Sequence, residues 1–248
     1  MATLPGDLIP VYSPARDVSE EQRFFGRFAV ALAILLLLSF AQWDVRGMLP
    51  LGGEPLWVHI HAVMMVVWLG VFAAQGLLAE NGSPELHRRL GIATLGIPAL
   101  IVATGYYTGF GAVRSHLVPP FFTDAYFLAF TTIGTTMFAA LILGGLAMRG
   151  RPEWHRRLML GSGILLMDPA LGRLVPMQSL GPWGPFVTMC IQLAFVLLVS
   201  WHDVRRRGVV HPATLVVGFT VIATLFFTTM AAIWTPFVVF ASSVASTG

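Results

Sequence analysis

The chain has 248 residues, of which 56% are hydrophobic and only 11% are charged. A soluble domain carries about 25% charged residues, so this chain has too few to solvate a globular surface. Its apolar residues fall in blocks of roughly 20, the length that crosses the hydrocarbon core of a bilayer. The composition therefore excludes a soluble globular protein and predicts a multi-pass membrane protein in contact with the lipid bilayer.

The basic and sulfur-containing residues exclude further classes of protein. All fifteen basic residues are arginine, and without lysine the chain cannot form a Schiff base, which excludes a retinal chromophore. The single cysteine, Cys190, excludes an internal disulfide, a thiolate-rich zinc site and haem attachment through CxxCH. The arginines do not resemble a nucleic-acid-binding face, so no nucleic-acid partner is expected.

In chain order, residues 1–18 are predicted to form a disordered cytoplasmic arm, and residues 19–248 a single transmembrane domain. Ser19 begins the sequence S-E-E-Q, a capping-box pattern that predicts the start of the first helix. Asp168-Pro169 falls inside a predicted span and should kink or break it. The apolar runs predict an all-α bundle of seven transmembrane helices, over residues 24–43, 56–79, 90–112, 124–148, 158–177, 185–201 and 213–240.

The arginines in alternate connections predict the orientation of the bundle. Twelve arginines fall on one side and three on the other, which predicts a cytoplasmic N-terminus and a C-terminus outside. The larger group is Arg16, Arg23, Arg27, Arg88, Arg89, Arg149, Arg151, Arg156, Arg157, Arg205, Arg206 and Arg207, and the smaller group is Arg46, Arg114 and Arg173.

One charged phrase occurs twice in this apolar chain. PELHRRL occupies residues 84–90 and PEWHRRL occupies residues 152–158. Each copy opens a predicted helix on the cytoplasmic side, and two helices separate the copies. They therefore point the same way across the membrane, which indicates a parallel internal repeat.

The histidine of the phrase is the residue that membrane anchoring does not explain. Proline, glutamate and arginine all suit a helix that enters from the headgroup region, whereas neutral histidine is a weak headgroup partner. Seven residues after His87 and His155, on nearly the same helix face, come Thr94 and Ser162. Two imidazoles from different helices could hold haem iron axially. Alternatively, His87, His155, His202 and Asp203 could hold a zinc or iron ion. A third interpretation is that the histidines only anchor the helices at the membrane interface.

A second polar cluster is predicted in the outer leaflet. His61, Asp168 and Arg173 lie at similar depths by residue count. An aspartate within the membrane is a functional candidate, and we expect Asp168 to contact His61 or Arg173.

The stretch WVHIHAVMMVVWLGVFAAQGLLAENGSPELHRRLG, residues 57–91, with the later RPEWHRRLML and DPALGRL, resembles a family of uncharacterised bacterial multi-span membrane proteins with a helix-opening HRRLG motif. The resemblance covers residues 55–207. It implies that His61, His87, His155, Asp168 and Arg173 are the polar positions of the family. The helix-borne histidines also give a looser similarity to transmembrane b-type cytochromes, which implies haem b.

Three functions follow from these patterns. The first is a haem b redox protein of the bacterial cytoplasmic (inner) membrane that exchanges electrons with a quinone or a partner subunit. The second is a zinc- or iron-dependent enzyme that modifies lipids. The third is a structural subunit of a larger membrane complex, and the oligomeric state is open.

Overall fold

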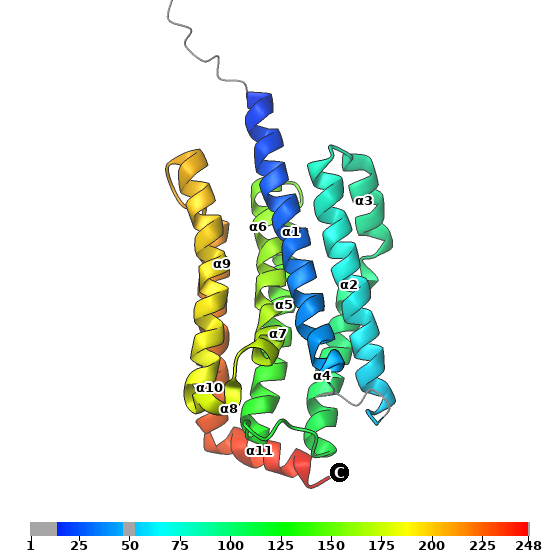
Figure 1. Cartoon of the computed structure of the whole chain (residues 1–248), viewed down its shortest axis with the longest axis vertical. Coiled ribbons are helices and arrows are strands. Elements are labelled where there is room, and N and C mark those ends of the chain that lie inside the picture. The colour runs from blue at the N-terminus through cyan, green and yellow to red at the C-terminus, as the bar shows by residue number, and fades with distance from the viewer. Residues whose placement is uncertain (1–13, 47–52, 248) are drawn as a thin grey trace, which may run out of the picture.

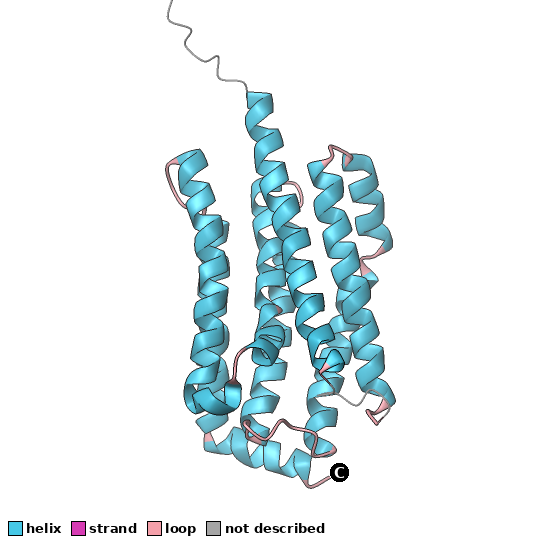
Figure 2. Cartoon of the chain, viewed as in Figure 1, coloured by secondary structure: helices cyan, strands magenta, loops and turns pink. Residues whose placement is uncertain are grey.

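A computed structural model describes residues 14–46 and 53–247, and within this part of the chain every regular element is a helix (Figures 1 and 2). The elements are α1 (Pro14–Val45), α2 (Leu56–Glu80), α3 (Pro84–Ala93), α4 (Gly96–Arg114), α5 (Asp124–Ala147), α6 (Pro152–Leu165), α7 (Met167–Leu174), α8 (Met177–Leu180), the 3-10 helix η1 (Gly181–Trp183), α9 (Gly184–Arg207), α10 (Pro212–Ile233) and α11 (Thr235–Ala245).

Six helical segments in the described residues are long and apolar enough to cross a membrane. They are Glu20–Trp43, Leu56–Glu80, Gly96–Arg114, Asp124–Ala147, Met177–Arg207 and Pro212–Ile233. The second and fourth predicted spans are reproduced within two residues. The count of seven is not confirmed, because the fifth predicted span, residues 158–177, is divided between two shorter helices.

The break in the fifth span was predicted from Asp168-Pro169, and its local chemistry is clear. Helix α6 ends at Leu165 and α7 begins at Met167. Pro169 has no N–H to donate to the carbonyl of Leu165, four residues before it. The side-chain amide of Gln192 on α9 takes over this role, because Nε2 donates to the carbonyl oxygens of Ile164 and Leu165 at 3.0 and 3.1 Å. The broken helix is thus satisfied by a neighbouring helix.

Two other breaks differ from the predicted spans and also coincide with prolines. The chain turns at Thr94 and Leu95 between α3 and α4, where the ring of Pro98 would clash with the carbonyl of Thr94 in a continuous helix. The last predicted span, residues 213–240, ends at Ile233 and continues as α11, whose first turn contains Pro236. In Figure 1, α11 lies across the lower end of the bundle.

The start of the first helix also differs from its prediction. Helix α1 begins at Pro14, so the capping-box start at Ser19 is wrong. Residues 14–18 of the predicted arm therefore belong to α1, and residues 1–13 lie outside the described residues.

Helix α6 is the centre of the bundle, and small residues allow other helices to approach it. Ser162 is fully buried. A Cβ added to Gly161 would lie 2.3 Å from Cγ2 of Val217 on α10, and one added to Gly163 would lie 2.9 Å from Cδ2 of Leu32 on α1. Close approach through small residues is typical of helix packing in membranes, where lipid gives little hydrophobic drive.

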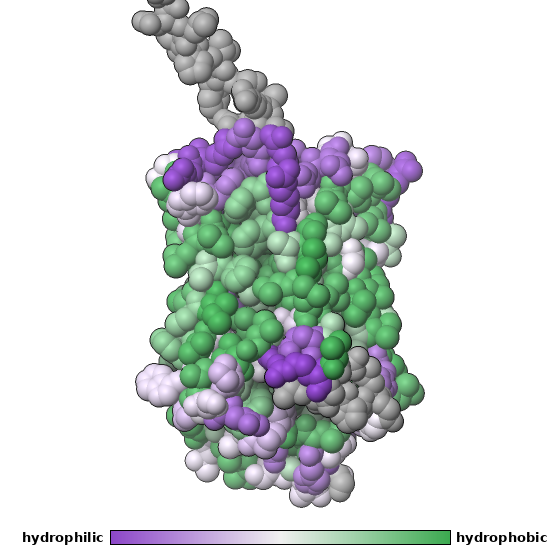
Figure 3. Space-filling view, viewed as in Figure 1, coloured by the Kyte–Doolittle hydropathy of each residue, from purple (hydrophilic) through white to green (hydrophobic). Residues whose placement is uncertain are grey.

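The bundle has two different ends. The start of α1 and the α2–α3, α5–α6 and α9–α10 connections all lie at the upper end in Figure 1. This end carries a hydrophilic band above a wide apolar zone (Figure 3). We call it the arginine-rich end, because these segments contain the larger predicted group of arginines.

Candidate functional site

Both copies of the repeated phrase open a helix at the arginine-rich end. Pro84 and Pro152 lie in the first turns of α3 and α6, and Glu85 and Glu153 follow them there. The proline lacks only an N–H that would have no helical partner, and the glutamate faces the positive end of the helix dipole. Proline and glutamate thus have the local role that the sequence predicts for them.

The arginines of the two copies differ completely in environment. Arg89 Nε donates to Glu85 at 2.8 Å, and the arginine side chain is 74% exposed. This hydrogen bond, together with the charge of Arg88, holds the pKa of Glu85 below its usual range. Arg157, which takes the place of Arg89 in the second copy, has a side chain only 1% exposed. The arginines are therefore not what the repeat has in common.

The histidines, in contrast, are held in the same way in both copies. His87 Nδ1 lies 3.2 Å from the backbone carbonyl of Gln75 on α2. His155 Nδ1 lies 2.8 Å from the backbone carbonyl of Gly145 on α5. A carbonyl can only accept, so each Nδ1 carries the proton and each Nε2 keeps its lone pair. This tautomer is the one in which histidine binds a metal through Nε2, with the other nitrogen fixed by a carbonyl.

The two rings also converge across the gap between their helices. The ring centres of His87 and His155 lie 6.2 Å apart, and the ring planes are nearly perpendicular at 88°. A metal–imidazole bond is about 2 Å long and the nitrogen lies about 1.2 Å from its ring centre, so a metal held between opposed imidazoles separates the ring centres by roughly 6.4 Å. The observed separation is close to this value.

The side chain of Gln75, beside the pair, packs closely on Gly91 and has an unused polar atom. The side-chain Oε1 of Gln75, the residue whose carbonyl fixes His87, is buried without a hydrogen-bond partner. A Cβ on Gly91, one turn after His87, would lie 3.3 Å from Nε2 of the same side chain. A buried acceptor without a donor is uncommon in a native structure, so this oxygen is free to accept a hydrogen bond from another group.

The predicted hydroxyl stripe does not join the histidines. Thr94 lies beyond the end of α3 as its C-cap, and its Oγ1 donates to the carbonyl of Leu90 at 2.8 Å. Ser162 Oγ donates to the carbonyl of Met159 at 2.7 Å. Each hydroxyl is therefore used by its own helical segment, which is the usual way to satisfy such groups inside a membrane.

Asp203, one of the predicted metal ligands, belongs to a separate buried network. Its carboxylate accepts hydrogen bonds from Arg157 Nε at 3.0 Å, from Thr214 Oγ1 at 2.6 Å and from the backbone N–H of His211 at 3.1 Å. Arg157 also donates from Nη2 to Asp203, and to Glu21 on α1 at 3.0 Å. These contacts tie α1, α6, α9 and α10 together and leave Asp203 little capacity for a metal.

Two neighbours of this network, Glu153 and His211, have pKa values below their usual range. Arg207 donates to the Glu153 carboxylate at 2.6 Å, and this hydrogen bond lowers the pKa of Glu153. Burial, and then the charges of Arg157 and Arg207, lower the pKa of His211. His211 Nδ1 accepts the backbone N–H of Ala213, so this neutral imidazole caps α10.

His202, the other predicted metal ligand, is held by aromatic rings. Its ring stacks on Phe24 with centres 3.8 Å apart and meets Phe25 edge-on at 5.8 Å. Among the described side chains, no three His, Cys, Asp or Glu residues gather in a way that could hold a metal ion. Of the four predicted metal ligands, the structure brings only His87 and His155 together.

The predicted contact of Asp168 with Arg173 or His61 is wrong. Asp168 lies beside Thr188 of α9. The guanidinium of Arg173 packs over the rings of Phe40 and Trp43 on α1, at 4.2 and 5.1 Å from the ring centres. Five residues along one helix rotate a side chain by about 140°, so residues 168 and 173 face different neighbours.

His61 faces α4 and is far from the histidine pair. Its Nδ1 lies 3.0 Å from Oγ1 of Thr104. Fourteen residues of α2 separate His61 from Gln75, a distance of about 21 Å along the helix. His61 therefore does not share a ligand with His87 and His155.

Several residues of these sites were missed at the level of sequence. Hydrogen bonds to backbone carbonyls, such as those of Gln75 and Gly145, cannot be predicted from residue types, because every residue has a carbonyl. Glu21 was assigned to a capping box, although an acidic residue that enters an apolar helix also suggests an ion-pair partner. Gln192, an amide within a long apolar run, was the clearest sequence indication of a buried polar contact between helices.

Fold and composition together define an all-helical integral membrane protein. No family model, curated protein or solved structure matches the chain.

Proposed function

We propose that the protein binds haem b between His87 and His155 and that it transfers electrons in the membrane. The observation that carries the proposal is the convergence of the two rings at 6.2 Å, each with Nδ1 fixed to a backbone carbonyl. Both Nε2 lone pairs would then be available to hold the iron.

The number of protein ligands favours haem over a bare ion. Structural zinc sites use four protein ligands and catalytic ones three, whereas haem brings four nitrogens of its own and needs two from the protein. The pair at residues 87 and 155 supplies that number. The buried, unpartnered Oε1 of Gln75, next to His87, is an acceptor that a bound group could engage.

Bound haem would supply one-electron chemistry. With His87 and His155 both holding the iron, the haem would favour electron transfer over the binding of a substrate at the metal. His87 and His155 lie in the first turns of helices that begin at the arginine-rich end. Electrons would therefore be exchanged near this face, with a quinone in the bilayer or with a partner subunit.

The proposed topology has seven crossings, with α6 and α7 forming one interrupted crossing. In Figure 1 the two helices follow each other through the bundle, and Gln192 satisfies the carbonyls at the break. The arginine-rich end is assigned to the cytoplasm of a bacterial inner membrane. Reporter fusions after residues 150 and 207 should both report a cytoplasmic location, and a periplasmic signal at either position would reverse the assignment.

The test of haem binding is an absorption spectrum of the purified protein, together with a metal analysis. We expect a Soret band with sharp α and β bands on reduction, at one haem per chain. His87→Ala and His155→Ala should each remove or shift these bands.

His116→Asn provides the matched control. His116 is exposed, is not part of the pair, and has a positive φ of 53° that asparagine tolerates. A red control and colourless site variants support the proposal. Colourless wild-type protein, after expression with haem supplied, would refute it, and stoichiometric zinc or iron in that protein would indicate the bare-ion alternative.

A further inference from the structure

A shallow groove of about 560 Å³ lies between α1 and α9 at the arginine-rich end, and neither His87 nor His155 lines it. Its lining comes from one face of α1 and from the end of α9, and comprises Glu20, Arg23, Phe24, Arg27, Phe28, Ala31 and Arg206. The apolar segment of α1 starts at Glu20. The groove therefore begins where α1 enters the apolar zone and runs down into it.

The mouth of the groove is positively charged. Three arginines and one glutamate line it. Arg206 pairs with Glu20, and Arg27 is bonded to Glu80 at 3.1 Å with a side chain that is 74% exposed. Arg23 is exposed and makes no ion pair with any described residue. Even after the neutralising pairs are counted, the mouth retains a cation that faces the headgroup level.

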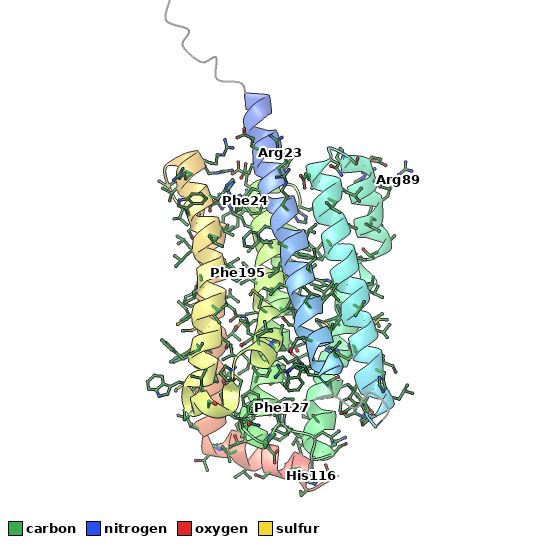
Figure 4. The ribbon with its side chains drawn as sticks, in the orientation of Figure 1. Arg23, Phe24, Arg89, His116, Phe127 and Phe195 are labelled. Atoms are coloured by element: carbon green, nitrogen blue, oxygen red, sulfur yellow. The ribbon has the colours of Figure 1, made fainter. Side chains whose placement is uncertain are left out.

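The floor of the groove is apolar and aromatic. Phe24 and Phe28 lie with ring centres 5.6 Å apart, and Phe28 meets Phe195 of α9 edge-on at 5.9 Å. Phe24 is in turn supported by the stacked ring of His202. In Figure 4 the labelled Arg23, Phe24 and Phe195 follow one another from the end of the bundle toward its middle.

We propose that this groove binds one anionic phospholipid, with its phosphate at Arg23 and Arg27 and the upper part of an acyl chain on Phe24 and Phe28. The order of groups along the groove matches that of such a lipid, with cations at headgroup level and apolar surface below. A guanidinium binds a phosphate through two parallel N–H donors. The phosphate of a zwitterionic headgroup should bind less strongly, because the cation of the same headgroup lies nearby. This site is independent of haem binding.

Native mass spectrometry can test the proposal with the full chain in a non-ionic detergent. The protein is mixed with equal amounts of dioleoyl phosphatidylglycerol and dioleoyl phosphatidylcholine, and the retained lipids are counted. Wild-type protein should retain one phosphatidylglycerol in preference to phosphatidylcholine. Each arginine near an anionic headgroup changes affinity by about fivefold, so Arg23→Gln combined with Arg27→Gln should reduce retention between about fivefold and 25-fold.

Arg88→Gln combined with Arg89→Gln is the matched control, because it removes the same charge at the same end but outside the groove. It should keep the retained lipid, and Arg23→Lys should keep most of it. Circular dichroism checks that each variant is folded. Equal retention of both lipids by wild type, or equal loss in the groove and control variants, would overturn the proposal. So would displacement of the lipid by glycerol phosphate at equal concentration, since that would indicate a site for small anions.

Discussion

Arg89 and Arg157 hold the same place in the repeated phrase, and we predict that their replacement by alanine has very different effects. Arg157 donates to Asp203 and Glu21, and also to the carbonyl of Glu153 at 2.9 Å. Its removal leaves the fully buried Asp203 carboxylate without a cation. Breaking a buried ion pair from one side is destabilising by about 3–5 kcal/mol. Replacement of Arg89, whose ion-pair partner Glu85 is exposed, should give no measurable loss of stability.

Thermal unfolding in detergent micelles measures the difference. For a chain of this size, a loss of that magnitude lowers Tm by on the order of 10 °C. The double variant Arg157→Ala/Asp203→Ala should be less destabilised than the sum of its single variants, because it removes both charges together. The reasoning is refuted if Arg157→Ala and Arg89→Ala lower Tm equally, or if the double variant shows no coupling.

Three further predictions concern stability, each measured by unfolding in detergent. Gln192→Leu should lower the free energy of unfolding by about 1–3 kcal/mol because two carbonyls lose their donor. Pro169→Ala in that background should recover part of this stability by restoring an N–H, and no recovery would contradict the account of the helix break. The pKa of His211 lies below the usual 6.5, so the unfolded chain binds a proton first as the pH falls, and stability present above about pH 6.5 is lost below it. His211→Asn, which keeps an N-cap acceptor, should flatten the dependence of stability on pH between about pH 7 and 5. An unchanged dependence would contradict the role assigned to His211. Gly161→Ala should clash with Val217 and lower the free energy of unfolding by about 1–3 kcal/mol, and Val217→Ala should relieve the clash. If the losses of stability in the two single variants simply add in the double variant, this contact is not the cause.

Composition and periodicity predicted the class of protein and most helix positions, because burial in lipid requires long apolar helices whatever their neighbours are. The break at Asp168-Pro169 was also predictable, since proline acts locally. The break before Pro98 carried the same local signal but was missed, because the apolar run continues through it.

Side-chain partners were harder to predict than helices. Arg88, Arg89, Arg156 and Arg157 belong to phrases that match at six of seven residues, and the HRRL segment around them does not distinguish the exposed Arg89 from the buried Arg157. Only the arrangement of α1, α9 and α10 around α6 makes that difference. The pairing of His87 with His155, in contrast, was suggested by the repeat itself, because the histidine was the one letter that anchoring did not require.

The way the two histidines are held has a consequence for biosynthesis. Each imidazole is fixed to the helix that precedes it in the chain, α2 for His87 and α5 for His155. The first hairpin can therefore orient its histidine as soon as it has entered the membrane, long before the ribosome reaches the second. A complete pair exists only after residue 155 has been inserted. Any group that needs both histidines must join the protein after more than half of the chain has been synthesised, and a chain that stalls earlier would expose a single, already oriented imidazole at the membrane surface.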